Sequence, residues 1–307
     1  MKKISLTAFA AFPFASAFII AFAAFATPPA RGQAPSDAFR PSRVESCAIS
    51  YSYSGKSGYK HDATPGETSV NHFNIGATGR MALGQATFLG YGAAFAINTM
   101  ESDDPVPAPE RLGALTLNIG VTQMFSKEWR GSVFASPGYR GDFGNYTLRT
   151  LSVPFMAVAN YTPAGGGTMW LFGVSVNPTG EHPVLPVVAF RWAFADDWAL
   201  NFGLPRLGVT WRATKALDLD LGATMQGGGY RVTKAPGNSG RGDLANTYVN
   251  YREIRAGVRA AYKIAKKASL SIEGGWMVDR RFDYHDRDYE IKGRSAAYIS
   301  TGVDVRF

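Results

Sequence analysis

The sequence predicts an all-β protein, a transmembrane up-and-down antiparallel β-barrel, and three observations support this prediction. Apolar and small polar residues alternate with a period of two along most of the chain after Ser42. Every second connection between the alternating segments is short, and the others are generally longer. Aromatic residues gather at the segment ends that flank the short connections. Helical periodicity is almost absent from the same region, so the pattern favours strands over helices.

Length and composition fit one large all-β domain. The chain has 307 residues, with 34 glycines, 46% hydrophobic residues and a formal net charge of +8. Mean hydropathy is −0.10, which excludes a protein built of membrane-spanning helices. Because the Lys and Arg residues are scattered, we expect solvated loops and a polar interior, with no nucleic-acid partner. Cys47 is the only cysteine, and no metal-ligand spacing is present, so we expect no internal disulfide, metal or cofactor.

The N-terminus is predicted to be a secretory signal peptide. A basic head at residues 2–3 is followed by an uncharged, largely apolar run at 4–30. Small residues at 24–26 offer a cleavage site, and 32–34 offers a second one. An uncleaved membrane anchor is the alternative, because the apolar run is about long enough to span a bilayer. We therefore expect a signal peptide at 1–26 (or cleavage after residue 34), a disordered linker at 27–43 and the barrel at 44–307.

The clearest predicted strand covers residues 115–125. Leu117, Ile119 and Val121 share one face, whereas Thr116 and Asn118 share the other. A strand placed between lipid and a wet interior has this pattern, because neighbouring side chains point to opposite faces. The same pattern predicts about fourteen strands, with twelve as the alternative: 46–54, 68–79, 85–98, 112–125, 129–140, 146–161, 168–177, 184–194, 197–204, 207–212, 217–226, 249–264, 269–279 and 296–307.

Connection lengths predict the orientation of the barrel. The connections at 126–128 and 265–268 are short, whereas those at 227–248 and 280–295 are long. This asymmetry is typical of outer-membrane barrels. Both termini fall on the side of the short turns, so we expect a protein of the outer membrane of a Gram-negative bacterium with both termini in the periplasm.

Large aromatic residues cluster beside the short turns. Amphipathic aromatic rings favour the membrane–water interface, and a soluble β-sandwich gives no reason to place them along one rim. We therefore predict outer-membrane lipid as a partner. The predicted aromatic girdle consists of Phe125, Trp129, Tyr161, Trp170, Phe194, Trp198, Trp211 and Tyr262.

Two segments resemble known families. Residues 297–307 alternate strictly and end on Phe307, which resembles the C-terminal strand of bacterial outer-membrane β-barrel proteins. The resemblance implies that the barrel assembly machinery is a partner, with Phe307 as the assembly signal. Residues 184–225 are similar to a family of predicted outer-membrane barrels catalogued only as a domain of unknown function. This second resemblance implies a fold and transfers no catalytic residue.

Charged residues on the inward face are the candidate lining of a lumen. The hairpin with its turn at 265–268 is predicted to pair Lys263 with Ser271, which places Glu273 diagonally opposite Lys263 and Arg259. With Glu273 as the only neutralising group beside Arg255, Arg259 and Lys263, surplus positive charge would give the lumen a weak anion preference. The lumen-lining candidates are Arg130, Arg191, Arg212, Asp218, Asp220, Arg255, Arg259, Lys263, Glu273, Asp304 and Arg306.

The long loops hold the first candidates for catalysis. An acidic pair at 103–104 and the group of Asp283, His285 and Asp286 resemble the acid and histidine pairs of the omptin outer-membrane proteases. The predicted strand count differs from that family, and a solvated charged loop is the simpler interpretation. A phospholipase-type barrel would need a His and a Ser at the membrane-facing rim, and His72 is predicted to point inward. We predict no catalytic residue.

We expect a passive outer-membrane channel or transporter for small solutes. The alternatives are a non-conducting barrel with a structural or adhesive role, and a hydrolase sited at the rim. Occlusion of the lumen would distinguish the first two, and loss of activity in a His285 variant would support the third.

Overall fold

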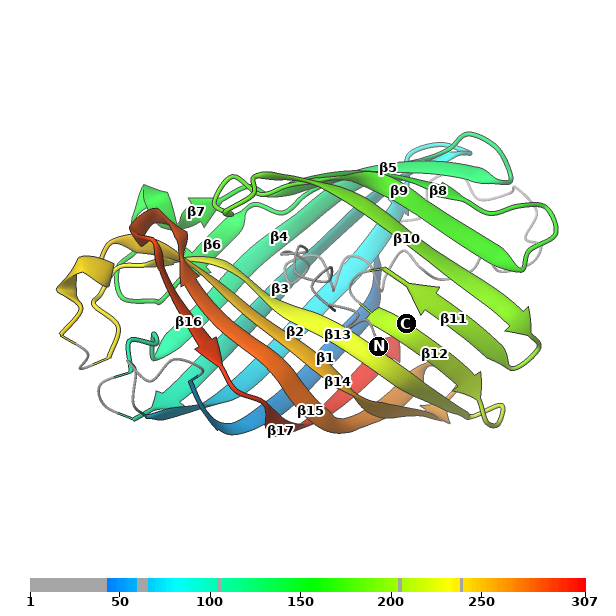
Figure 1. Cartoon of the computed structure of the whole chain (residues 1–307). Coiled ribbons are helices and arrows are strands. Elements are labelled where there is room, and N and C mark those ends of the chain that lie inside the picture. Colours follow the sequence, from blue (N-terminus) through cyan, green and yellow to red (C-terminus); the bar gives the residue numbers. More distant parts are fainter. Residues whose placement is uncertain (1–42, 60–65, 104–105, 204–205, 238–239) are drawn as a thin grey trace, which may run out of the picture.

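The chain folds into one closed antiparallel β-barrel (Figure 1). The computed structural model describes residues 43–59, 66–103, 106–203, 206–237 and 240–307. The first strand pairs with the last, where Ser46 lies opposite Arg306 and Ser54 lies opposite Tyr298. This pairing closes the sheet and confirms the predicted barrel. The predicted signal peptide and nearly all of the predicted linker lie outside the described residues.

The described residues form seventeen strands and three short 3-10 turns, and none of their helices has the length and apolar character needed to cross a membrane. The elements are β1 (Arg43–Gly58), β2 (Glu67–Ala82), β3 (Thr87–Ser102), β4 (Arg111–Met124), β5 (Trp129–Ala135), β6 (Gly138–Gly141), η1 (Leu148–Thr150), β7 (Leu151–Ser152), β8 (Phe155–Tyr161), β9 (Thr168–Val176), β10 (Val184–Ala195), β11 (Trp198–Phe202), β12 (Arg206–Arg212), β13 (Leu217–Val232), η2 (Gly242–Leu244), β14 (Thr247–Ala265), β15 (Ala268–Tyr284), η3 (His285–Arg287), β16 (Tyr289–Gly293) and β17 (Ala296–Arg306).

Three pairs of these strands are segments of one interrupted wall strand: β5 with β6, β7 with β8, and β16 with β17. For example, β4 pairs with β5 and then with β6, and β15 pairs with β17 and then with β16. Among the described residues, the barrel therefore has fourteen wall strands, as the alternation predicts. Prolines account for two of the interruptions, because Pro137 and Pro154 cannot donate a backbone hydrogen bond to a ladder.

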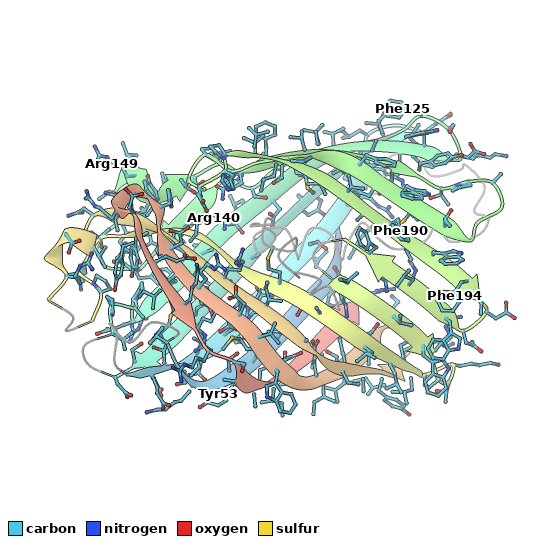
Figure 2. The ribbon with its side chains drawn as sticks, in the orientation of Figure 1. Tyr53, Phe125, Arg140, Arg149, Phe190 and Phe194 are labelled. Carbon is cyan, nitrogen blue, oxygen red and sulfur yellow. The ribbon has the colours of Figure 1, made fainter. Side chains whose placement is uncertain are left out.

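The outward face is apolar around the barrel. On β4, Leu115, Leu117 and Ile119 are 56%, 62% and 51% exposed. Figure 2 shows that Phe125 and Phe194 also point away from the ribbon at the end of the barrel with the short turns. Large apolar side chains that a closed sheet leaves exposed on its outside are placed to contact lipid tails. The sequence predicted this outward set on β4 correctly.

A short charged belt on β14 and β15, made of Arg252, Asp279 and Arg281, ends the apolar band of these two strands on the side of the long loops. Between β14 and β15 a β-bulge inserts Val278, so that Ile254 lies opposite Asp279 on the outer face. Strict alternation would have placed Asp279 in the lumen. Beyond the bulge, the Asp279 carboxylate forms ion pairs with the guanidinium groups of Arg252 at 3.1 Å and Arg281 at 3.6 Å. Charged pairs on the outer surface mark the limit of the membrane-spanning part.

The barrel narrows towards the long loops. There β6 lies between β4 and β13, since Gly141 pairs with Gly113 on one side and with Arg231 on the other. Thr233 donates to the Asp142 carboxylate through its backbone N–H at 2.6 Å, which fastens this contact. The wall at this end therefore bypasses β8 to β12. In the part of the chain that the structure describes, nine strands form this narrow ring: β1, β2, β3, β4, β6, β13, β14, β15 and β16.

Side chains fill the narrow ring. The Tyr284 hydroxyl of β15 donates to the carbonyl of Pro107, in the connection between β3 and β4, at 2.8 Å, and Asn98 of β3 donates to the Tyr230 hydroxyl of β13 at 3.3 Å, so side chains link elements that are not neighbours in the ring. A barrel of about eight strands has an interior that side chains can fill. The buried hydrophobic residues of this core are Tyr59, Val70, Met100, Val106, Ala108, Leu112, Ala114, Tyr230, Val232, Leu244, Val249, Tyr251, Phe282, Tyr284 and Ile291.

Candidate functional site

The candidate site is the lumen, and its character changes along β14. The inward side chains of Lys263, Arg259, Arg255 and Glu253 follow one another from the short-turn mouth towards the narrow ring. Their exposed fractions are 48%, 33%, 4% and 0%. Inward side chains that remain exposed show that water reaches the interior near the mouth. The lumen is therefore open at the short-turn end and filled at the other end.

The charged residues near the mouth are paired. Asp218 lies 3.4 Å from the Lys263 ammonium and 4.0 Å from the Arg212 guanidinium. Further in, Asp220 lies 3.9 Å from the Arg259 guanidinium. Apart from the buried Asp220 these groups are partly exposed, and distances of this length give weak attraction. The structure thus brings together five of the residues predicted to line the lumen.

The expected role of Glu273 was wrong. Lys263 lies opposite Ser269, not Ser271, because β14 and β15 are joined by a two-residue turn with an irregular pair at Ala265. Glu273 lies directly opposite Arg259 in the ladder, but its carboxylate forms an ion pair with Arg206 at 3.2 Å, and the Tyr298 hydroxyl donates to it at 2.7 Å. Asp218, Asp220 and Glu253 neutralise the basic wall in its place. The predicted anion preference therefore cannot depend on Glu273 being the only neutralising group beside these cations.

A buried cluster of three charged residues closes the charged side of the lumen. Glu253 accepts a hydrogen bond from Arg280 at 2.7 Å and another from Arg255 at 2.8 Å. Arg255 also donates to Ser52 and Ser54 on β1, at 2.7 and 2.9 Å. Charges removed from water in this way are stable only when they are almost completely paired. Strict alternation from Arg255 could have identified Glu253, whereas Arg280 faces inward only because of the bulge at Val278.

The opposite wall of the lumen is apolar, which the sequence analysis did not predict. Strands with apolar residues on both faces lose the alternation on which that analysis depends. The lumen consequently has one charged half and one apolar half. The apolar half is lined by Phe134 of β5, Met156 and Val158 of β8, Leu171 of β9, and Val187 and Ala189 of β10.

The four remaining lining candidates occupy inward positions nearer the mouth. Arg191 donates to Asn201 of β11 at 3.1 Å. Arg130 lies opposite Asn160 near the start of β5. Asp304 and Arg306 lie at the end of β17 and are exposed at the rim.

The predicted girdle residues lie on the outer face near the short turns, and several are in contact. The ring centroids of Trp129 and Tyr161 are 4.7 Å apart, and those of Trp198 and Trp211 are 5.6 Å apart. Phe307 is 67% exposed, and its backbone N–H donates to the Glu45 carbonyl at 2.9 Å. Their roles at a membrane interface and in assembly remain predictions.

The candidate catalytic residues have structural partners. Asp103 pairs with Lys56 at 3.3 Å, and residue 104 lies outside the described residues. His285 contacts Asn250 at 3.5 Å, and Asp286 accepts a hydrogen bond from the Thr247 hydroxyl. Within the described ranges, no group of three or more His, Cys, Asp and Glu residues could hold a metal ion.

The carboxyl group of Asp283, near the long loops, should make the stability of this region depend on pH. Asp283 lies past the charged belt, outside the membrane-spanning part of β15. Burial, together with the neighbouring Glu181 and Glu290 carboxylates, raises its pKa to about 6, against the lowering effect of Arg281. The fold thus favours protonated Asp283, so its contribution to stability is present at low pH and is lost as the pH rises to about 6.

We expect the loop at 177–183, which carries Glu181, to detach progressively from β15 as the pH rises through about 6. A fluorophore attached to a cysteine at His182, in a Cys47→Ser background, should gain mobility between pH 5 and pH 7. Asp283→Asn should abolish this change, since an asparagine side chain cannot ionise in this pH range. A transition that persists in that variant would assign it to another group.

The model of a family described as Domain of unknown function (DUF6268) matches residues 44–292. No curated protein matches the chain. Among solved structures, the chain is similar to the COG4313 outer membrane channel from Pseudomonas putida F1, with 11% identity and a TM-score of 0.46 over 90% of this chain and 100% of that one. It is also similar to OprB from Pseudomonas putida (8% identity, TM-score 0.40, 87% and 94% covered) and to LpxR from Salmonella typhimurium (12%, 0.36, 85% and 100%).

Proposed function

The chain belongs to the family described as Domain of unknown function (DUF6268), and we propose that it is a passive outer-membrane channel for small solutes. The observation that carries the proposal is the fall in exposure along β14, from 48% at Lys263 to 0% at Glu253. It supports a water-accessible lumen that begins at the short-turn mouth. Concave sites with apolar walls and a few placed polar groups are suited to small molecules.

We propose the orientation from the same features. The short turns and both termini face the periplasm, as is usual for outer-membrane barrels. The aromatic girdle then lies at the periplasmic interface, and the charged belt at Arg252, Asp279 and Arg281 lies at the outer one. Phe307, at the periplasmic end, would be accessible to the assembly machinery.

The filled ring favours a second candidate, a non-conducting barrel with a structural role. In that case the buried Glu253 cluster and the core around Tyr251 and Phe282 serve only stability. Reconstitution in planar bilayers distinguishes the two functions. Purified protein that inserts and never conducts ions would support the structural barrel.

We expect a mild anion preference from the charges at the mouth of the lumen. The reason differs from the one in the sequence analysis, which depended on Glu273. Lys263 and Arg212 share the single carboxylate of Asp218, which leaves one surplus positive charge. Changing both to glutamine should shift the reversal potential towards cations. The shift should be larger at low salt, because the Debye length grows to about 30 Å at 0.01 M. Lys266→Gln, on the two-residue turn outside the lumen, should leave the reversal potential unchanged.

A further inference from the structure

We propose that Arg140 binds the carboxylate of a small amphipathic anion at the inner end of the lumen, with the apolar part of the solute against the apolar half of the wall. Arg140 lies on β6, where the lumen meets the narrow ring (Figure 2). The inference rests on the proposed channel function and specifies its class of solute.

Arg140 is a buried cation that lacks a counter-charge. It is 4% exposed, and its Nε atom has no hydrogen-bond partner. In the part of the chain that the structure describes, no carboxylate forms an ion pair with it, in contrast to Arg255 and Arg280, which share Glu253. An arginine side chain stays charged, and a buried charge is stable only when it is paired. The Arg140 guanidinium is therefore placed to receive an anion.

The side chain of Arg140 faces the interior of the barrel. Arg140 lies opposite Ala114 of β4, which is 8% exposed and belongs to the core of the narrow ring. The next residue of β4, Leu115, is 56% exposed on the outer face. Because neighbouring residues of a strand point to opposite faces, Arg140 points inward with Ala114.

The guanidinium of Arg140 is directed back towards the lumen. Gly141 lies opposite Arg231 in a parallel pair, which puts Arg140 level with Tyr230 of β13. A Cβ built on Gly228, two residues closer to the short-turn end, would lie 3.8 Å from the terminal Nη1 atom of Arg140. The charged group therefore lies nearer to the mouth than the backbone that carries it.

The β13 wall in front of this guanidinium is not filled by a side chain. A Cβ built on Gly228 would meet nothing closer than 3.7 Å, the distance to the Tyr230 ring. Gly228 and Gln226, successive inward positions of β13, both remain partly exposed. A solute that moves inward along the lumen can therefore approach Arg140 along β13.

A second unpartnered polar group lies beside Arg140. Ser152 of β7 is 5% exposed, and its hydroxyl has no hydrogen-bond partner. Ser152 lies opposite Gly138, which makes it the diagonal neighbour of Arg140 across β6 and β7. Leu151 is 55% exposed on the outer face, so Ser152 points inward. A planar guanidinium fork and a hydroxyl are together suited to a carboxylate.

The wall on the mouth side of this pair is apolar. Met156 follows Ser152 by four residues on the same wall strand, lies opposite Phe134, and is 3% exposed. Four residues of extended chain span ~13 Å. A carboxylate held at Arg140 would thus place a short apolar chain or ring against Met156 and Phe134. An inorganic anion would use only the polar part of this arrangement.

Binding of a defined probe tests the site without requiring ion conduction. Radiolabelled 4-phenylbutyrate is added to purified protein in detergent, and bound label is measured by scintillation proximity. Unlabelled 4-phenylbutyrate, its uncharged amide and acetate are the competitors. We expect the amide and acetate to compete at least tenfold more weakly than 4-phenylbutyrate. Competition by acetate that equals that of 4-phenylbutyrate overturns the amphipathic class of solute.

Arg140→Gln should weaken binding of 4-phenylbutyrate about ten- to a hundredfold, as expected for loss of hydrogen bonds to a charged group. The acid and its amide should then compete equally, which a general loss of stability would not produce. Gly228→Val retains the cation, fills the space in front of it and should also weaken binding. The matched control, Arg149→Gln, removes an exposed arginine nearby in η1 and should leave binding unchanged. Heat-modifiable migration on gels identifies folded protein.

Unchanged binding in folded Arg140→Gln and Gly228→Val, or no saturable binding in the wild type, overturns the site and shows that Arg140 serves only stability. Ion conduction by the same protein in planar bilayers would leave the channel function standing. Protein that binds the probe through Arg140 and never conducts ions overturns the channel function and supports the binding site alone.

Discussion

Changing Glu253 to glutamine should lower the free energy of unfolding of the barrel by about 3–5 kcal/mol, because two buried cations then lose their shared carboxylate. Arg280 and Arg255 each lie 2.7 Å from Glu253, and the three side chains are 0%, 4% and 0% exposed. The Ser52 and Ser54 hydroxyls accept hydrogen bonds from Arg255, and the Ser57 hydroxyl accepts one from Arg280 at 3.1 Å, but hydroxyls cannot replace a negative charge. Urea unfolding in detergent micelles, followed by loss of the heat-modifiable band on gels, measures the change.

The matched control is Glu290→Gln. Glu290 also pairs with two cations, Arg281 at 2.8 Å and Lys292 at 2.7 Å, but all three side chains are about one-third exposed. Water can replace the lost pairing there, so we expect a loss of about 0–1 kcal/mol. Equal losses for the two variants would show that the Glu253 cluster is hydrated and that the lumen reaches further than the core around it indicates.

Changing Ile119 to arginine should destabilise the assembled barrel by about 2–4 kcal/mol, the cost of an outward cation near the middle of a membrane. Ile119 is 51% exposed on β4, between Tyr91 on one neighbouring strand and Ala135 on the other. The mature protein should otherwise fractionate with outer membranes and migrate on gels in a heat-modifiable way. Recovery of the folded fraction against wild type gives the measurement.

Two further substitutions on β4 distinguish the effect of depth in the membrane from the effect of which face of the strand carries the cation. Gln123→Arg places the same cation on the outer face beside the short turn, where we expect a loss of about 0–1 kcal/mol. Asn118→Arg places it in the lumen and should be mild, although it removes the acceptor of the 2.8 Å hydrogen bond from Ser136. Equal sensitivity at Ile119 and Asn118 would contradict the assignment of the two faces.

The sequence predicted the fourteen wall strands because each crosses a membrane whose two sides differ in polarity. It missed the extensions of β13 to Val232 and of β14 back to Thr247. In these extensions, and in the first predicted residues of β14 that pair with them, the pattern is inverted. Val249 and Tyr251 point into the core, whereas Arg252 lies on the outer surface. Beyond the membrane the barrel is packed like a soluble protein, so a rule based on an apolar outside fails there.

The candidate site could be predicted only where the register is regular. Asp218, Asp220 and Arg259 lie on uninterrupted parts of β13 and β14, and alternation placed all three on the inward face. Arg280 was missed because one inserted residue moves it to the other face. The apolar half of the lumen was missed because Met156 and its neighbours look, in sequence, like lipid-facing residues.

The unequal height of the wall has a consequence for the surrounding bilayer. Strand β14 has 19 residues and β11 has 5, which at ~3.4 Å per residue gives lengths of ~65 Å and ~17 Å before tilt. The hydrophobic band of such barrels is ~25 Å tall, so β11 is too short to match it. Lipid beside β11 and β12 must therefore thin or tilt, at a fraction of a kcal/mol per Å of mismatch. The stability of this protein should therefore depend on the acyl-chain length of the lipid. Short-chain lipids should match the wall at β11 and β12, and longer-chain lipids should match the rest of the wall.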